Sequence, residues 1–249
     1  LEKLFPEWTP WSNVRVVVTR WPNRVLNAAL WLAGRPCLDG LVGGADVWLA
    51  PNLNFTRVSP GVRLVQTVHD LSFEVYPQFY SWKMRAWHAA VQPRALARRA
   101  ELVITPSEYT RQEIIGRWVV PAEQVQVVYP GAPEKKDFTS IKLLPQSGLQ
   151  LPSKYFLCLG TIEPRKNILG TLAAFTEWRA RFDPAAALVI AGASGWQDEK
   201  LYAAAQHTAG VHVLGAVTEA QKAALWQGST CLVYPSWYEG FGLPIAEAM

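Results

Sequence analysis

The stretch Tyr155-Phe-Leu-Cys-Leu-Gly-Thr-Ile-Glu-Pro-Arg-Lys-Asn167 passes from five apolar residues into a polar turn, and a helix-like segment, Asn167–Arg181, follows it. Similar apolar runs occur at Ala187–Ala191, Val211–Leu214 and Cys231–Tyr234, and the helix-like segments Gln197–Thr208 and Glu219–Gln227 separate them. Short continuous runs of this kind are typical of strands buried on both faces of a parallel sheet. Strands that alternate with helices predict βαβ units, and therefore a doubly wound α/β sheet in the second half of the chain.

The first half of the chain shows the same alternation less regularly. The predicted strands are Val14–Thr19, Val47–Ala50, Leu64–Val68, Leu102–Thr105 and Val125–Val128, and the predicted helices are Arg24–Ala33, Ser81–Ala100 and Glu108–Trp118. Ser107 is a candidate N-cap for the last of these helices. Residues 130–152 combine Pro, Gly, Lys and Ser without clear periodicity, which indicates a connection between domains. We therefore expect two α/β domains, residues 1–150 and 151–249.

Charge is distributed unevenly along the 249 residues. Residues 1–150 carry 17 basic and 12 acidic side chains, whereas residues 151–249 carry 7 and 8. This basic excess favours an anionic partner for the first half, but it is too small for a nucleic-acid-binding surface. No apolar stretch approaches the roughly 18 residues of a membrane-spanning helix. Three widely spaced cysteines, Cys37, Cys158 and Cys231, are expected to be reduced core residues of a cytosolic protein.

The ends of the chain are unusual for a complete protein. The chain begins at Leu1 rather than Met, and it stops at Met249 directly after a helix-like run that starts at Leu243. No signal-peptide pattern occurs at Leu1. We expect a fragment or an incomplete gene product that lacks material at both ends.

A glycine-rich turn with two carboxylates follows the last predicted strand, in Glu239-Gly-Phe-Gly-Leu-Pro-Ile-Ala-Glu247. Gly240 and Gly242 allow backbone amides to approach a ligand closely, and the start of the helix offers free N–H groups. Glu239 can accept hydrogen bonds from sugar hydroxyls, and Glu247, about two turns further on, could reach a ribose. The alternative is an ordinary turn with a capping Glu and a surface Glu, and these residues alone leave both open.

Two adjacent cations, Arg165 and Lys166, lie where the strand 155–159 passes into a helix. Side chains of this kind at such a junction can bind a diphosphate. The sequence contains no Asp-x-Asp pair, phosphate loop or dinucleotide fingerprint, and its four histidines lack metal-ligand spacing. We therefore expect no metal site, with phosphate charge neutralised by side-chain cations and helix ends. The alternative is a solvated basic pair, which the helix dipole slightly disfavours at this position.

Two features of the first half have both a functional and a structural interpretation. His69 follows the predicted strand Leu64–Val68, so its imidazole could enter a cleft between domains, although a lone histidine is more often structural. Trp82 and Trp87 alternate with basic residues up to Arg99, and this stretch could contact an anionic membrane or a lipid-linked acceptor. Pro93 interrupts the stretch, and the alternative is a solvated basic face over core aromatics.

Five motifs occur in the order and spacing of one family. They are His69-Asp70-Leu71, Thr105-Pro-Ser-Glu108, Val128-Tyr-Pro-Gly131, Leu159-Gly-Thr-Ile-Glu-Pro-Arg-Lys-Asn167 and the pair Glu239 and Glu247. Together they resemble the family 4 retaining glycosyltransferases of the GT-B fold over about residues 47–249. Within that family the chain looks most like bacterial mannosyl- or rhamnosyltransferases of polysaccharide biosynthesis. The resemblance implies two Rossmann-like, doubly wound domains that face a cleft, both incomplete here.

The resemblance also implies roles for the matched residues. Lys166 would bind the donor diphosphate, and Arg165 would substitute for a family arginine whose position is Thr161 here. Glu239 would bind hydroxyls of the donor sugar, with backbone contacts from Gly240, Phe241, Gly242 and Leu243. Glu247 would bind the nucleotide ribose, His69 would lie near the reacting face of the sugar, and Gly215 and Val217 would lie beside the base.

The activity implied is the retaining transfer of a hexose from a nucleotide sugar, with GDP-mannose as a candidate, to a glycan or lipid-linked acceptor. It falls in the EC 2.4 class and needs no metal or other cofactor. The cysteines predict a cytoplasmic protein, the stretch with Trp82 and Trp87 predicts peripheral contact at the inner face of the membrane, and the modest charge predicts no nucleic-acid partner. The family's Gly-rich loop after the first strand is not recognisable here, and the portion after Glu247 is absent. The second hypothesis is therefore a non-catalytic fragment that binds sugar nucleotides, or an interaction module.

Overall fold

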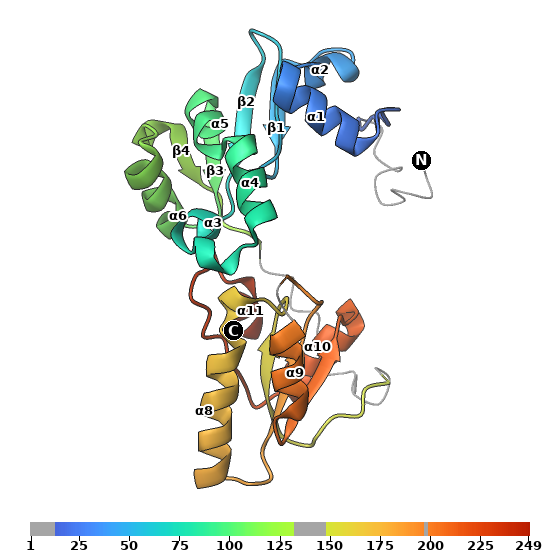
Figure 1. Cartoon of the computed structure of the whole chain (residues 1–249), viewed down its shortest axis with the longest axis vertical. Helices are drawn as coiled ribbons and strands as arrows, with labels where there is room; N and C mark the ends of the chain where they lie inside the picture. Colours follow the sequence, from blue (N-terminus) through green and yellow to red (C-terminus); the bar gives the residue numbers. More distant parts are fainter. Residues whose placement is uncertain (1–12, 132–147, 197–198) are drawn as a thin grey trace. The chain divides into compact units, whose positions relative to one another are not determined.

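The computed structural model describes residues 13–131, 148–196 and 199–249, and these form two compact units (Figure 1). The first unit takes in the chain up to Val68 together with Trp87–Thr105 and Arg111–Gln126. The second takes in His69–Ala86, Pro106–Thr110 and the chain from Val127 onward. Each unit contains a four-stranded sheet, which confirms the predicted α/β class. Two short segments of the first half of the sequence thus belong to the second unit.

The first sheet has the strand order β1-β2-β3-β4, formed by Val47–Ala50, Arg63–Thr67, Leu102–Thr105 and Val125–Val127. β1 pairs in parallel with β2, and β2 pairs in parallel with β3. These four strands agree with the prediction to within a residue. The prediction of a strand at Val14–Thr19 is wrong, since this segment has no regular secondary structure and makes no ladder with any described strand. A β-branched run becomes a strand only where a neighbour accepts and donates its backbone hydrogen bonds.

Of the three helices predicted in the first half, two lie where the sequence predicts them and the third is divided in two. The helices of this half are α1 (Asn23–Ala33), α2 (Leu38–Leu41), α3 (Ser72–Val75), α4 (Trp82–Val91), α5 (Pro93–Arg99) and α6 (Glu108–Glu113), which continues into a π-helical turn at Ile114–Trp118. The single helix predicted at Ser81–Ala100 is wrong. Gln92 adopts a left-handed conformation with φ of 53°, and Pro93, which has no N–H to donate, starts a new helix there. Ser107 is confirmed as an N-cap, because its Oγ accepts from the Thr110 N–H at 3.1 Å.

The second sheet has the strand order β7-β6-β5-β8. Its strands are β5 (Tyr155–Leu159), β6 (Ala187–Ala191), β7 (Val211–Gly215) and β8 (Cys231–Leu232), and every neighbouring pair is parallel. The four strands lie where the apolar runs predict them, although β8 is shorter than its run. From β5 the chain winds outward through β6 to β7, and it then returns to place β8 on the other side of β5.

Both faces of the second sheet are buried. Alternate residues of β5 and β6, such as Cys158 and Ile190, pack against α8 (Ile168–Arg181) and α9 (Glu199–His207). The intervening residues, such as Leu157 and Val189, pack with Leu225 of α10 (Glu219–Gly228). This double cover explains why the strands are continuous apolar runs rather than alternating ones. A last helix, α11 (Leu243–Ala248), follows the glycine-rich turn.

The structure also tests two expectations from composition. All three cysteines are free thiols, and Cys158 is buried, which raises its pKa to about 11. The prediction of a core position is wrong for Cys231, which is exposed, and only half right for Cys37, which is half-buried. Cys231 is exposed because β8 is an edge strand of the sheet. In the described parts of the chain, no helix combines the length and the apolar character needed to cross a membrane.

Gly192 allows the loops after β5 and β6 to touch, since an added Cβ would lie 1.8 Å from the carbonyl oxygen of Gly160. Replacing Gly192 with Ala is expected to lower the free energy of unfolding by about 1–3 kcal/mol, because the two backbones must separate. Urea denaturation followed by tryptophan fluorescence measures this change. Gly40→Ala is the matched control, since nothing lies within 4 Å of its Cβ position. An equal effect of both substitutions would contradict the steric explanation.

Candidate functional site

The strand order of the second sheet brings two loops together at the carboxyl ends of β5 and β8. The chain leaves β5 on one side of the sheet and pairs β8 with β5 on the other side. Ligands of doubly wound sheets commonly bind at such a reversal of strand order. The loop after β5 carries Arg165 and Lys166, and the loop after β8 carries Glu239. Residues 73 and 74 positions apart in the sequence therefore become direct partners.

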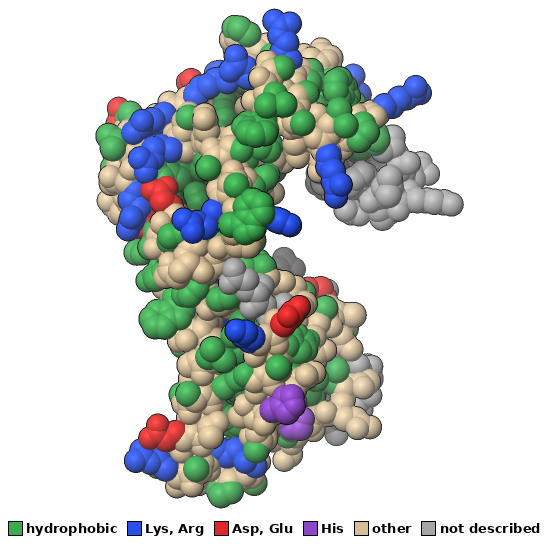
Figure 2. Space-filling model, in the orientation of Figure 1, with side chains coloured by type: hydrophobic (Ala, Val, Ile, Leu, Met, Phe, Trp, Pro, Cys, Tyr) green, Lys and Arg blue, Asp and Glu red, His purple; other side chains and the backbone are tan. Residues whose placement is uncertain are grey.

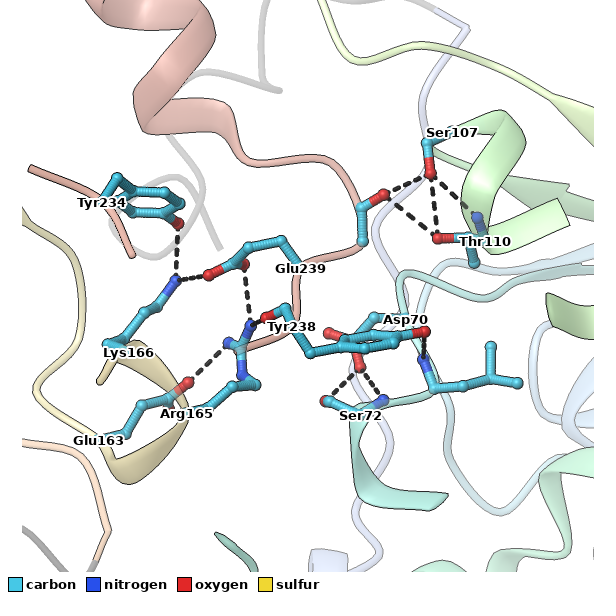
Figure 3. Close-up of polar contacts among 12 residues, drawn as sticks. Asp70, Ser72, Ser107, Thr110, Glu163, Arg165, Lys166, Tyr234, Tyr238 and Glu239 are labelled. Carbon is cyan, nitrogen blue, oxygen red and sulfur yellow. Dashed lines mark hydrogen bonds and ion pairs between the residues drawn. The ribbon is translucent and has the colours of Figure 1, made fainter. Parts of the chain in front are cut away.

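Glu239 lies between the two cations (Figure 3). Its Oε2 is 2.8 Å from Arg165 Nη1, and its Oε1 is 2.6 Å from Lys166 Nζ. On its other side Arg165 pairs with Glu163, with 2.6 Å between Nη2 and Oε1. Glu163 is buried, and the other three side chains are largely covered. Two positive and two negative charges thus form a compact, nearly neutral group, which we call the Glu239 cluster.

Backbone contacts hold the two loops of the Glu239 cluster in register. Arg165 and Lys166 lie in a 3-10 turn, Pro164–Lys166, between β5 and α8. The carbonyl oxygen of Arg165 accepts from the Trp237 N–H at 2.9 Å. The Nη1 atom of Arg165 donates to the carbonyl oxygen of Tyr238 at 2.7 Å. Arg165 therefore contacts the loop after β8 through both its backbone and its side chain. It joins the two loops as well as carrying charge.

Tyr234 completes the environment of Lys166. The Lys166 ammonium donates to Tyr234 Oη at 2.7 Å and lies 4.9 Å from the centre of the same ring. An ammonium near an aromatic ring gains electrostatic stabilisation from the ring as well as from the hydroxyl. Burial and the negative charge of Glu239 both raise the pKa of Tyr234, so the phenol remains neutral. Lys166 thus has one charged partner, Glu239, and one neutral partner.

The two carboxylates of the cluster have opposite pKa shifts. Burial alone would raise the pKa of Glu239, but the charges of Arg165 and Lys166 outweigh it and hold the pKa below its ordinary value of 4.5. For Glu163 burial dominates and raises the pKa, although Arg165 opposes the rise. Burial would also lower the pKa of Arg165, yet Glu239 and Glu163 outweigh it and raise that pKa. Arg165 and Glu239 are therefore both firmly ionised at neutral pH.

Segments of the first half of the sequence pack on the glycine-rich turn within the second unit. The Cβ that Gly240 lacks would lie 1.9 Å from the carbonyl oxygen of His69. The Leu71 N–H donates to Tyr238 Oη at 3.4 Å. Ser107 Oγ and Thr110 Oγ1 both donate to the carbonyl oxygen of Gly240. His69 thus lies beside the turn that carries Glu239, with its backbone against Gly240 and its side chain exposed.

Glu247, the second predicted glutamate, pairs with Lys222. The Lys222 Nζ lies 3.1 Å from Glu247 Oε1 and 3.0 Å from Glu219 Oε2. Lys222 belongs to α10, whose N-cap, Thr218, directly follows Val217. Gly215 ends β7 with φ of 72°, a conformation that favours glycine. Glu247 is therefore joined to the helix that follows Gly215 and Val217, and no ion pair among the described residues links it to the Glu239 cluster.

Several residues of the site are not among those predicted from the sequence. They are Glu163, Tyr234, Tyr238, Thr110 and Lys222. Glu163 stands inside the quoted motif and could have been considered as a partner of Arg165. The others contact residues from distant strands or loops, so no spacing in the sequence identifies their partners. The described residues contain no group of three or more His, Cys, Asp and Glu side chains arranged to hold a metal ion.

Comparison with known proteins gives matches along most of the chain. Residues 140–249 match the family described as Glycosyl transferases group 1, and residues 40–136 match Glycosyltransferase Family 4. The solved structure of WaaG, a glycosyltransferase involved in lipopolysaccharide biosynthesis, superposes with a TM-score of 0.65 over 94% of this chain and 65% of that one. The two halves of this chain match glycosyltransferase families, and its fold is that of the GT-B glycosyltransferases. At 17% identity, the WaaG structure supports the fold of this glycosyltransferase and nothing finer.

Similar proteins include mannosyltransferases of polysaccharide assembly. The O-antigen chain mannosyltransferase B of Escherichia coli is 32% identical over 204 residues, which cover 75% of this chain and 50% of that protein. A structure of Anabaena Alr3699/HepE in complex with UDP and glucose has a TM-score of 0.54 at 21% identity, over 75% of this chain and 50% of that one. The glycosyltransferase chain thus spans about half the length of the curated relatives it matches.

The lowered pKa of Glu239 predicts a specific dependence of stability on pH. Because the pKa is depressed in the folded state, ionised Glu239 stabilises the fold above pH 4.5, and this contribution is lost as the pH falls through the folded-state value. The difference in free energy of unfolding between the wild type and Glu239→Gln should be largest near neutral pH and shrink in acid. Urea denaturation at a series of pH values measures it.

Glu177→Gln is the control for this prediction, since Glu177 makes an exposed pair with Arg181. Its effect on stability should be small at every pH. Glu163, whose pKa is shifted the other way, is present in all three proteins, but Glu239→Gln also removes one of the charges that raise the Glu163 pKa. A difference between wild type and Glu239→Gln that grew in acid would show that the assigned direction is wrong.

Proposed function

We propose that this glycosyltransferase chain binds the donor of a retaining hexosyl transfer, in which a mannose-like sugar passes from a nucleotide sugar to a glycan or lipid-linked acceptor. The observation that carries the proposal is the convergence of Arg165, Lys166 and Glu239 at the carboxyl ends of β5 and β8. Adjacent cations suit a diphosphate, and a carboxylate suits sugar hydroxyls. The similarity to mannosyltransferases favours mannose, with GDP-mannose as the candidate donor.

Lys166 is the cation that would meet the diphosphate. In the Glu239 cluster both cations share one carboxylate, but Arg165 also has Glu163 as a charged partner. If Glu239 turned toward the sugar hydroxyls, Arg165 would remain neutralised by Glu163, whereas Lys166 would keep only the neutral hydroxyl of Tyr234. A buried cation without an anionic partner is costly, so Lys166 has the stronger electrostatic reason to bind a phosphate.

The proposed reaction needs no metal ion. The carbon–oxygen bond between the sugar and the diphosphate breaks, Lys166 stabilises the negative charge that develops on the leaving group, and the sugar becomes oxocarbenium-like. The acceptor hydroxyl attacks the same face of the sugar, and its proton passes to the leaving phosphate. Glu239 would orient the sugar hydroxyls rather than form a covalent intermediate of the kind seen in retaining glycosidases. His69, beside Gly240, would lie near the reacting face.

The acceptor side of the proposal concerns α4 and α5. Trp82 is 73% exposed and Trp87 is 37% exposed, and basic residues follow each of them in the sequence. Figure 2 shows many Lys and Arg side chains over the first unit on the face drawn. Exposed tryptophans and basic side chains together suit the headgroup region of an anionic membrane. They support peripheral contact at its inner face, where a lipid-linked acceptor would be available.

Ligand binding to the full chain tests the donor assignment. GDP and GDP-mannose should raise the melting temperature, because a ligand that binds only the folded state stabilises it. Lys166→Met should weaken the binding of GDP by about 1.5–3 kcal/mol, roughly 10- to 150-fold, through loss of charge-assisted hydrogen bonds. Thermal shift with GDP, UDP and ADP, followed by calorimetry, measures both effects.

Lys154→Met is the matched control for this binding experiment, since Lys154 is exposed and lies before β5. Its affinity for GDP should equal that of the wild type. EDTA should change neither binding nor transfer, and a strict requirement for manganese would contradict the metal-free mechanism. Binding without transfer to any glycan or lipid-linked acceptor would favour the non-catalytic alternative.

Glu239→Gln and Glu247→Gln should separate the sugar from the nucleotide. Glu239→Gln should lower turnover of GDP-mannose roughly 10- to 150-fold, the scale of one charge-assisted hydrogen bond of about 1.5–3 kcal/mol. The affinity of Glu239→Gln for GDP should not fall, because the substitution also frees Lys166 from its competing carboxylate. Glu247→Gln should instead lower the affinity for GDP itself. Steady-state kinetics and calorimetry, with circular dichroism as the check on folding, measure the pair. Equal losses of GDP and GDP-mannose affinity in Glu239→Gln would refute its assigned role.

A further inference from the structure

The peptide group that joins Gly240 to Phe241 is held by two hydroxyls (Figure 3). Ser107 Oγ and Thr110 Oγ1 both donate to the Gly240 carbonyl oxygen, Thr110 at 3.2 Å. Ser107 Oγ meanwhile accepts from the Thr110 N–H at 3.1 Å, so its lone pair caps α6, while its own proton faces two acceptors, the Gly240 carbonyl oxygen and Thr110 Oγ1 at 3.2 Å. One serine therefore both caps a helix and reaches a loop more than 130 residues away in the sequence.

Thr110 has no solvent exposure, which makes its contact with Gly240 informative. A buried hydroxyl needs a hydrogen-bond partner, and threonines inside helices usually find one in the carbonyl four residues earlier. Thr110 stands in the first turn of α6, where the hydroxyl points to the Gly240 carbonyl instead. The interaction thus joins the start of α6 to the glycine-rich turn, and the N-cap alone would not require it.

The residues on either side of Glu239 are both anchored. Tyr238 is buried, its hydroxyl accepts from the Leu71 N–H, and its ring lies 5.7 Å from that of Tyr109. Gly240 lies against the His69 carbonyl so closely that no side chain fits there. With Tyr238 and Gly240 fixed, the backbone of Glu239 has little freedom, and its carboxylate is directed to Arg165 and Lys166.

A planar trans peptide points its C=O and its N–H in opposite directions. Since the Gly240 carbonyl faces Ser107 and Thr110, the Phe241 N–H faces away from them, and it has no acceptor among the described residues. The flanking residues, Gly240 and Gly242, tolerate backbone conformations that would let this peptide turn over. We propose that Ser107 and Thr110 are positioning residues that fix the Gly240–Phe241 peptide, so that Glu239 and the Phe241 N–H are presented to the donor. The role toward the donor rests on the proposed function.

Variants of Ser107 separate the two uses of its hydroxyl. Ser107→Asp keeps an oxygen that can cap α6 but removes the proton donated to Gly240. Ser107→Thr keeps both. Thr110→Val removes the second donor with little change in shape. The matched control is Thr176→Val, because Thr176 also donates to a backbone carbonyl, that of Leu172 at 2.8 Å, but within α8.

Hydrogen exchange of the full chain, read by mass spectrometry over residues 238–243, tests the proposal without any ligand. Ser107→Asp combined with Thr110→Val should exchange about tenfold faster in this segment, the scale of two lost hydrogen bonds, while the strands of the second sheet stay protected. The same variant should bind GDP about tenfold more weakly. Ser107→Thr and Thr176→Val should match the wild type in both measurements.

Unchanged exchange in the double variant would overturn the proposal, and so would a loss of GDP affinity in Ser107→Thr equal to that in Ser107→Asp. Faster exchange with unchanged GDP affinity would reduce the two hydroxyls to a structural role and also overturn it. If the double variant lost protection from hydrogen exchange throughout the second sheet, the single variant Thr110→Val would be used instead. Its exchange over residues 238–243 and its affinity for GDP would be judged by the same criteria. A wild-type chain that bound no nucleotide would refute the proposed function, and the exchange data would still decide whether the hydroxyls hold the peptide.

Discussion

The carboxylate of Glu239 between Arg165 and Lys166 is the interaction on which the rest of the site depends. Two adjacent cations that are largely removed from water repel each other, and each is costly to leave unpaired. Glu239 compensates both, with one oxygen on each. In the proposed function, a donor diphosphate of comparable negative charge would take the place of the carboxylate on Lys166 at little electrostatic cost. The arrangement would then keep the cations in place before the donor arrives, and Glu163 would keep Arg165 compensated afterwards.

Close backbone approach supports this charge arrangement. The Gly160 carbonyl lies against Gly192, and the His69 carbonyl lies against Gly240. In both cases the approach is closer than a side chain would allow. The segments His69–Leu71 and Ser107–Thr110 pack on the glycine-rich turn and belong to the second unit, although the strands that precede them belong to the first. Motifs scattered over more than 170 residues thus share one site because each lies where a strand ends and a loop begins.

The two glutamates of the glycine-rich element have different electrostatic partners. Glu239 meets the cations that follow β5, whereas Glu247 meets Lys222 of α10, beyond the end of β7. This separation matches the expected division of a nucleotide sugar into a sugar and diphosphate end and a nucleoside end. The ion pair with Glu247 also places Lys222 on the nucleoside side of the proposed site. No sequence motif surrounds Lys222.

The sequence by itself determined the α/β class and seven of the eight strands in the described residues nearly to the residue, because buried strands are continuous apolar runs. It also singled out Arg165, Lys166 and Glu239 as candidate site residues, because they follow strand ends. It failed at Val14–Thr19 and at Gln92, where a ladder partner and a left-handed backbone decide the outcome. Only the tertiary structure decided that β8 pairs with β5, and with it that Glu239 neutralises both cations, that Tyr234 contacts Lys166 and that Ser107 reaches Gly240. Strand order and long-range partners depend on how elements pack in space, and local periodicity carries no record of that packing.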